Sequence, residues 1–199
     1  MKNLLLSVVV LFFLIGANAQ DNHVEPGIKV GLNLAQIKEE NSDYSDMLAG
    51  FHLGGLVHIH LTRHLAIQPE LVFSSQGSKQ TFSNIIYTTR LNYINIPVLF
   101  QYMLGTGFRF QTGPQLGVLL SAKDKHGSIT DNIISNCKRY DFAWVLGMSY
   151  IMKSGLGFDT RYNVGLTSIY TSAYPKHFNR VFQFGVLYQF GKKAHALKE

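Results

Sequence analysis

The stretch Tyr140 to Met152, YDFAWVLGMSYIM, alternates between large apolar residues and small or polar ones. One set comprises Tyr140, Phe142, Trp144, Leu146, Met148 and Tyr150, and the opposing set includes Asp141, Gly147 and Ser149. A period of two is typical of a β-strand with one apolar face and does not fit a helix. The stretch also reaches the ~9–11 residues that a tilted membrane-spanning strand needs.

Seven further segments repeat this alternation: Pro26 to Ala35, Gly50 to Thr62, Leu65 to Ser75, Thr88 to Tyr102, Phe108 to Leu120, Leu156 to Thr167 and Phe182 to Phe190. The connections switch between tight turns and long polar stretches, the long ones being Gln36 to Ala49, Gln76 to about Ile86, Ser121 to Arg139 and Ser168 to Asn179. This rhythm predicts an all-β fold, an eight-stranded antiparallel transmembrane up-and-down β-barrel, with its tight turns in the periplasm and its long loops outside the cell.

Alternation alone does not separate a membrane barrel from a soluble barrel with an apolar interior. The strand glycines decide between them, because nearly all lie on the polar face: Gly31, Gly54, Gly113, Gly117, Gly147, Gly157, Gly165 and Gly185. The interior of an eight-stranded barrel is barely wide enough for side chains, so the face with small residues is the inner one. We therefore expect the apolar face to contact lipid.

The charges on the expected inner face balance in sign. Buried charges are costly unless they are paired, so we predict a neutral polar network that fills the lumen. Its expected members are Lys29, His52, His58, His60, Glu70, Arg109, Asp141, Asp159 and Arg161.

The composition supports a surface that does not face water. Hydrophobic residues make up 46% and charged residues 15% of the chain, whereas soluble proteins carry about 25% charged residues. The formal net charge of +6 is scattered. No basic stripe with interleaved aromatic residues is present, which argues against nucleic acid as a partner. A single cysteine, Cys137, excludes an internal disulfide.

The first residues have the features of an export signal. A short basic start is followed by the apolar run Leu4 to Ile15 and by the small residues Ala17-Asn18-Ala19. The run is too short for a spanning helix. We predict a signal peptide at 1–19, a barrel at 20–190 and a short polar periplasmic tail at 191–199.

Two local features deviate from the regular alternation. In the fourth segment, Leu91 and Tyr93 are out of phase with the later apolar residues, which predicts a bulge near Tyr93. Three prolines, Pro69, Pro97 and Pro114, each remove a hydrogen-bond donor from the sheet. We expect them at bulges or strand ends.

Three stretches resemble a known family: LAIQPELVFSSQG at Leu65 to Gly77, LNYINIPVLFQY at Leu91 to Tyr102, and GPQLGVLLSAK at Gly113 to Lys123. They are similar to the PorT-type outer-membrane barrel family of Gram-negative bacteria, and the fold resembles small barrels of the OmpA and OmpX type. The resemblance covers essentially the whole mature chain. It implies a barrel in the outer membrane, and the family's name member implies an accessory role in protein secretion.

The same resemblance bears on single residues. The family commonly has Glu and Lys where this chain has Asn95 and Gln101, so a site built on those charges is not expected here. Phe190 resembles the terminal aromatic residue that the barrel assembly machinery reads, which implies that machinery as a partner.

We expect no metal, cofactor or catalytic site. The three histidines on one strand have no cysteine or regularly spaced carboxylate beside them in sequence. The carboxylates Glu70, Asp141 and Asp159 would need a cleft that a filled lumen does not offer. A lipid-modifying enzyme would need a nucleophile, a base and an acid, but Ser121, Asp124 and His126 match no known spacing.

The outer loops are the expected site of function, because rigid scaffolds commonly bind through loops. Candidate contacts to a protein or glycan are Tyr44, Cys137, Tyr170 and Tyr174. The sequence thus predicts a structural or interaction protein in contact with outer-membrane lipid. The alternatives are an accessory component of a secretion apparatus, a narrow pore and, less favoured, a lipid-modifying enzyme.

Overall fold

The computed structural model describes residues 24–40, 45–82, 85–172 and 175–190. The predicted signal peptide at 1–19, the tail at 191–199, Tyr44 and Tyr174 lie outside these ranges. The strands are β1 (Val24–Glu39), β2 (Asp46–His60), β3 (Leu65–Phe82), β4 (Ile85–Met103), β5 (Phe108–His126), β6 (Ile129–Asn132), β7 (Tyr140–Ile151), β8 (Leu156–Gly165) and β9 (His177–Gln189). A 3-10 helix, η1 (Ile134–Asn136), precedes β7.

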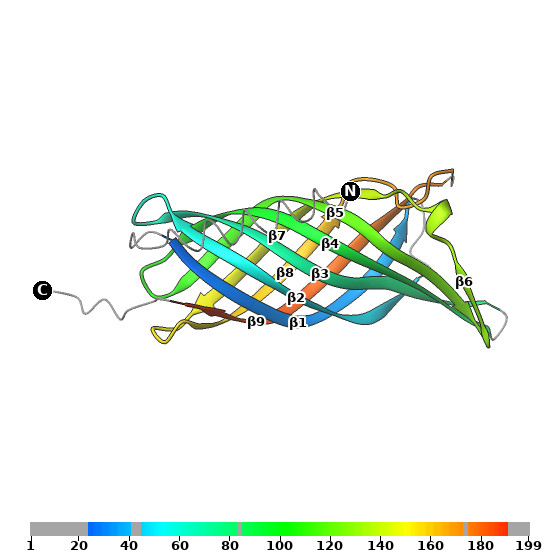
Figure 1. Ribbon diagram of the computed structural model, residues 1–199, viewed down its shortest axis with the longest axis horizontal. Helices are drawn as coiled ribbons and strands as arrows, with labels where there is room; N and C mark the ends of the chain where they lie inside the picture. The colour runs from blue at the N-terminus through cyan, green and yellow to red at the C-terminus, as the bar shows by residue number, and fades with distance from the viewer. Residues whose placement is uncertain (1–23, 41–44, 83–84, 173–174, 191–199) are drawn as a thin grey trace, which may run out of the picture.

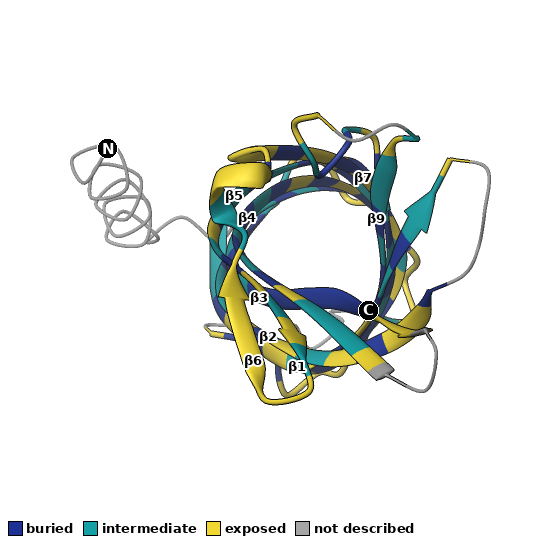
Figure 2. Ribbon diagram, turned by 90° about the vertical axis from the view of Figure 1, so that its right-hand side faces the viewer, coloured by how far each residue is buried: buried dark blue, intermediate teal, exposed yellow. Residues whose placement is uncertain are grey.

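The nine described strands form one sheet in the order β4-β3-β2-β1-β9-β8-β7-β5-β6 (Figure 1). An additional antiparallel pairing of β4 with β5 closes the ring, and β6 pairs only with the outer end of β5. The view along the barrel shows this closed ring, with β6 outside it (Figure 2). The predicted barrel of eight antiparallel strands is confirmed. No helix among the described residues has the length and apolar character needed to cross a membrane.

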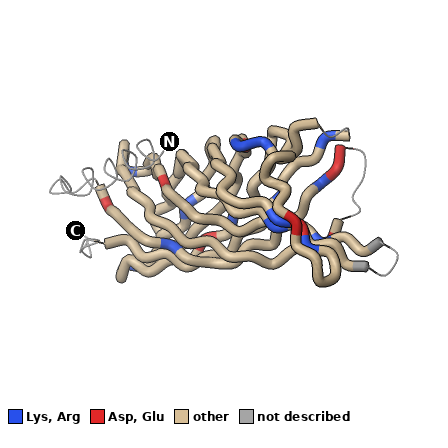
Figure 3. The backbone as a smooth tube through the Cα atoms, turned by 45° about the vertical axis from the view of Figure 1, so that its right-hand side comes forward, with Lys and Arg blue, Asp and Glu red and all other residues tan. Residues whose placement is uncertain are grey.

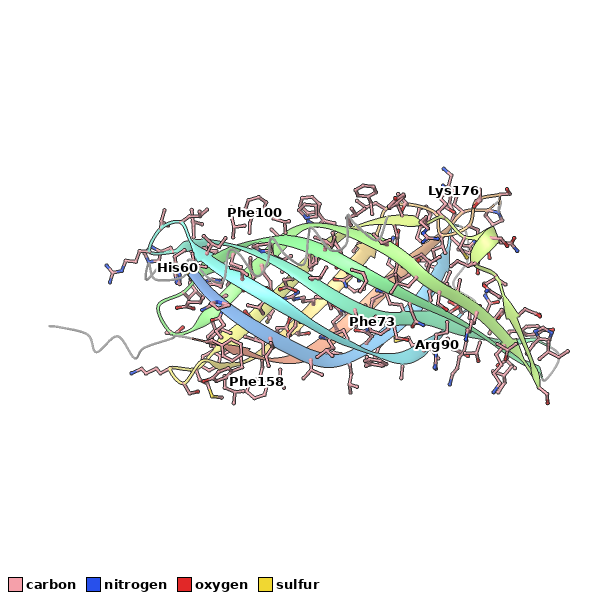
Figure 4. All side chains as sticks on the ribbon, in the orientation of Figure 1. His60, Phe73, Arg90, Phe100, Phe158 and Lys176 are labelled. Atoms are coloured by element: carbon pink, nitrogen blue, oxygen red, sulfur yellow. The ribbon has the colours of Figure 1, made fainter. Side chains whose placement is uncertain are left out.

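The apolar face points outward. Leu53 and Phe110 are 55% and 53% exposed, whereas Lys29 and Glu70 on the other face are 2% and 0% exposed. The side chains of Phe100 and Phe158 project from the outer surface (Figure 4). This arrangement places apolar groups against lipid and polar groups in the lumen, as the glycine distribution predicts.

Two predicted loops are largely strand. Gln76 to Ile86 forms the continuation of β3 and the start of β4, and Ser121 to Arg139 contains the end of β5, all of β6 and η1. These parts extend beyond the rest of the barrel, as Figure 1 shows. We call these parts the protruding sheet. It consists of β6, of β3 from Gly77 onward, of β4 up to Arg90 and of β5 from Lys123 onward. The prediction was wrong because the apolar alternation of the membrane part ends there, and the outward face carries mostly polar and charged residues such as Lys79, Arg90 and Lys123.

The bulge expected near Tyr93 is present, but it belongs to β5. Asn92 pairs with Ser121 and Tyr93 pairs with Leu119, so Leu120 is the extra residue. β4 itself keeps its phase: Leu91 and Tyr93 point inward, on the same face as Asn95. The predicted phase change within the fourth segment is therefore wrong.

The three prolines lie inside strands, with no register shift beside them. Pro69 pairs with Val98, Pro97 with Gln115 and Pro114 with Trp144. In an antiparallel ladder, both backbone groups of a residue point to the same neighbouring strand. Each proline keeps its pairing on one side, and the ladder is interrupted on the other side only. The prediction of bulges or strand ends at these positions is wrong for that reason.

Candidate functional site

The middle of the lumen holds a cluster of four charged side chains from β1, β3 and β8. Lys29 Nζ lies 2.8 Å from Asp159 Oδ2 and 3.8 Å from Glu70 Oε2. The guanidinium of Arg161 donates two hydrogen bonds of 2.7 Å to the Glu70 carboxylate, and its Nε lies 2.6 Å from Asp159 Oδ2. Two cations and two anions cancel, so no net charge is buried. Because β3 and β8 lie across the ring from each other, the cluster links opposite walls of the barrel.

A layer of neutral polar side chains lies between His52 and its neighbouring strands, next to the charged cluster. The Nδ1 atom of His52 lies 2.8 Å from Asn33 Oδ1. The Asn33 amide donates to Ser74 Oγ at 2.9 Å, and Gln183 donates to Asn33 Oδ1 at 3.0 Å. Asp141 lies apart from the charged cluster, where it accepts hydrogen bonds from Thr167 and Asn179. Among the described residues Asp141 forms no ion pair, and its polar contacts are these hydrogen bonds from neutral side chains.

The periplasmic end of the lumen brings Arg109 to His58. Arg109 donates from one nitrogen to His58 Nδ1 at 3.3 Å and from another to Gln189 Oε1 at 3.1 Å. Glu25, directly across from His58 on β1, completes a group of potential metal ligands with His60, whose donor atoms lie within 4.8 Å of one another. Two histidines and a carboxylate are donors that Zn²⁺ accepts.

The adjacent guanidinium of Arg109 opposes a cation at this position, because it bears a positive charge and hydrogen-bonds one of the expected ligands. His52 lies elsewhere, with Asn33. The three histidines of β2 therefore do not form one group. Glu25 was missed because the first segment was started at Pro26, although the inward series Lys29 and Gly27 extends to Glu25 when it is continued backward.

An apolar cap closes the extracellular end of the lumen. We define the cap as the buried cluster Ile37, Leu91, Tyr93, Leu119, Ala122, Cys137 and Ile169, with Ile133, Ile134 and Tyr170 packed against it. Residues of β1, β4 and β5 thus meet residues of the β6–β7 and β8–β9 connections over the polar interior. The chain segments carrying Cys137 and Tyr170 are joined by a β-bridge.

Cys137 and Tyr170 are part of this cap. Cys137 is 8% exposed. Burial raises the pKa of its thiol to about 11, and burial raises the pKa of the Tyr170 hydroxyl to about 12. The thiol is therefore protonated and weakly reactive at neutral pH. The expectation that Cys137 contacts a partner from an exposed loop does not fit its buried position.

The residues considered for lipid chemistry do not converge. Asp124 accepts a hydrogen bond from Thr89, and His126 stacks on Tyr87. Ser121 pairs with Asn92, five residues along β5 from His126, which corresponds to about 17 Å of strand. These side chains form no nucleophile, base and acid arrangement.

A closed ring of strands with an apolar exterior and a charged, crosslinked interior defines an integral membrane β-barrel. The sequence comparison agrees: residues 18–171 match the family described as outer membrane protein beta-barrel domain. The chain belongs to this family, and its location is the outer membrane. No curated protein sequence matches it. Membership in the PorT-type group in particular remains a prediction.

Two solved structures have the same fold. Neisserial surface protein A superposes with a TM-score of 0.59 at 12% identity, covering 83% of this chain and 97% of that chain. The attachment invasion locus protein Ail of Yersinia pestis, in complex with the heparin analogue sucrose octasulfate, gives a TM-score of 0.52 at 14% identity, with 84% and 99% covered. At this identity the likeness shows the fold alone.

Proposed function

We propose that the protein is a structural or interaction protein whose filled barrel holds the protruding sheet and the cap outside the cell. The observation that carries the proposal is the cluster of Lys29, Glu70, Asp159 and Arg161, which crosslinks the lumen at mid-height. It supports a barrel that acts as a rigid support. The sheet above it offers exposed positions such as Ile129 on β6 to a partner.

A narrow pore is the alternative that the cluster disfavours. The paired side chains lie across the path that ions would take, and a buried charge left without its partner costs about 3–5 kcal/mol. The cap adds a second, apolar barrier. In planar bilayers the purified protein is expected to show no steady conductance, and steady open channels in the wild-type protein would overturn the filled lumen.

A role through an external partner predicts contacts at the extracellular end of the barrel, whereas a role in a secretion apparatus predicts contacts at its periplasmic end. A photo-crosslinking residue at Ile129 reports on the protruding sheet, and one at Ser154 reports on the periplasmic turn between β7 and β8. In intact cells the proposal expects protein or glycan adducts at Ile129 and none at Ser154. Adducts at Ser154 alone would favour a periplasmic accessory role. The lipid A of a deletion strain is expected to be unchanged, and altered acylation would support an enzyme instead.

A further inference from the structure

The outward face of the protruding sheet carries four cations. Arg90 of β4 is paired directly with Lys123 of β5, and Thr88 is paired with both Lys79 of β3 and Lys125. Directly opposed residues share a face and have Cβ atoms about 4.5–5.5 Å apart. We call Lys79, Arg90, Lys123 and Lys125 the basic face. All four are exposed.

Among the described residues one carboxylate, Asp46, lies on this face, so the four cations outnumber the acids there. None of the four cations forms an ion pair with a described acid. Asp124, between two of the lysines in sequence, points to the opposite side and accepts a hydrogen bond from Thr89. Asp46 lies beside Lys79 at the edge of the face, without an ion pair. Like charges directly opposite each other destabilise a sheet, so a bound anion would relieve a repulsion built into the register.

The basic face continues the lipid-facing surface. Phe73, Ile94 and Val118 form the last apolar row across β3, β4 and β5. The next outward row is Ser75, Asn92 and Ser121, and the row after that is Gly77, Arg90 and Lys123. Charged residues are sparse along the membrane part of the tube and gather at this end (Figure 3), and Arg90 is seen where the strands leave the barrel (Figure 4).

Arg90 and Lys123 lie just beyond the head groups, within reach of their long side chains, and Lys79 and Lys125 lie one row farther out. Arg90 lies four residues beyond Ile94 toward the extracellular end of β4, which corresponds to about 13 Å of strand. At a tilt of about 40° this places it about 10 Å above the last apolar row. The polar region adds roughly 5–8 Å to each side of the hydrocarbon core, and a long arginine or lysine side chain spans the remaining distance.

We propose that the basic face binds the phosphate groups of phosphorylated lipids in the outer leaflet, the chemistry of lipid A, while the acyl chains of the same lipid lie on the row of Phe73, Ile94 and Val118. Arginine binds phosphate oxygens with two parallel hydrogen bonds, and lysine contributes a point charge. The site depends neither on the filled lumen nor on an external protein partner.

The test uses the full-length protein in detergent, with bisphosphorylated lipid A as the probe and native mass spectrometry as the readout. Each cation near an anionic head group is worth about fivefold in affinity. The double variant R90Q/K123Q is therefore expected to bind lipid A about 25-fold more weakly than wild type. The matched control R63Q/K153Q removes two exposed cations from the periplasmic turns and is expected to bind as wild type does.

Dephosphorylated lipid A provides the second comparison and should bind weakly and equally to all variants. The proposal would be overturned if R90Q/K123Q and R63Q/K153Q lost the same affinity for lipid A. It would also be overturned if the wild type bound dephosphorylated lipid A as tightly as the bisphosphorylated lipid. Displacement of lipid A by millimolar inorganic phosphate would assign the site to free phosphate. Tighter binding of heparin than of lipid A would assign it to a sulfated glycan. Heat-modifiable migration on gels confirms that each variant is folded.

Discussion

The two halves of β4 have opposite polarity although the strand keeps one phase. In the membrane half, Phe100 faces outward and Gln101 inward. In the outer half, Arg90 faces outward and Leu91 is fully buried inside. The surrounding solvent accounts for the difference: lipid favours apolar groups on the outside, whereas water favours their burial on the inside.

The same inversion occurs in neighbouring strands. In β1, Leu34 faces outward, and Ala35 and Ile37 beyond it are buried. In β5, Leu119 is buried in the cap whereas Lys123 faces outward. The molecule therefore has a polar interior within the bilayer and an apolar interior above it. The change in solvent along each strand is enough to explain both.

Removal of one cation from the polar interior should have the largest effect. Arg161→Leu leaves the carboxylates of Glu70 and Asp159 short of a partner. We expect a loss of about 3–5 kcal/mol in the free energy of unfolding. Urea titration followed by gel migration measures it, with Arg63→Leu in an exposed turn as the control. A loss no greater than that of the control would show that the cluster does not stabilise the barrel.

A charge on the lipid-facing side should come next. Val98 lies at the centre of the outward apolar series of β4, so Val98→Lys is expected to cost about 2–4 kcal/mol. Asn92→Lys, on the same face but beyond the last apolar row, is expected to cost about 0–1 kcal/mol. Equal costs in lipid vesicles would contradict the boundary between Ile94 and Asn92.

The cap should behave as a small water-soluble core. Leu119 is fully buried, so Leu119→Ala is expected to cost about 2–3 kcal/mol through the cavity it leaves. The adjacent bulge residue Leu120 is 42% exposed. Leu120→Ala should therefore cost well under half as much in the same urea titration, and a reversed order would show that the cap is not packed.

The smallest expected effect concerns alkaline pH. Burial raises the pKa of the Cys137 thiol from 9.0 to about 11. The stabilising contribution of the neutral thiol is complete below pH 9, and it is lost as the pH rises from 9 toward 11, because the unfolded chain ionises first. The urea midpoint of the wild type should therefore fall more between pH 8 and pH 10.5 than that of Cys137→Ala. If the urea midpoints of the two proteins fell equally over this pH range, the Cys137 thiol would be exposed to water in the folded protein.

The sequence predicts the membrane part well and the outer part poorly. Lipid imposes strict alternation, so the eight strands and the inward direction of Lys29 and Glu70 could be read from it. Outside the bilayer the alternation inverts, and β6 and the outer parts of β3 and β4 were therefore taken for loops. The apolar residues Leu91 and Tyr93 were noticed, but they were attributed to a change of phase instead of a change of solvent.

The contacts between distant strands could not be predicted from sequence. That Arg161 pairs with Glu70 while Asp141 is bound by neutral groups depends on shear and register, which alternation does not encode. The burial of Cys137 likewise depends on how its loop folds back over the lumen. The positions of the prolines were predicted wrongly because the sequence does not show which neighbouring strand the backbone of each proline faces.

Site-directed spin labels along β4, in a Cys137→Ala background and in lipid vesicles, test the inversion most directly. Labels at Phe100 and Ile94 should be relaxed by oxygen dissolved in the lipid, a label at Arg90 by a water-soluble nickel reagent, and labels at Leu91 and Asn95 by neither. Nickel access at Ile94 and Phe100, or lipid contact at Asn95, would contradict the assignment of the faces.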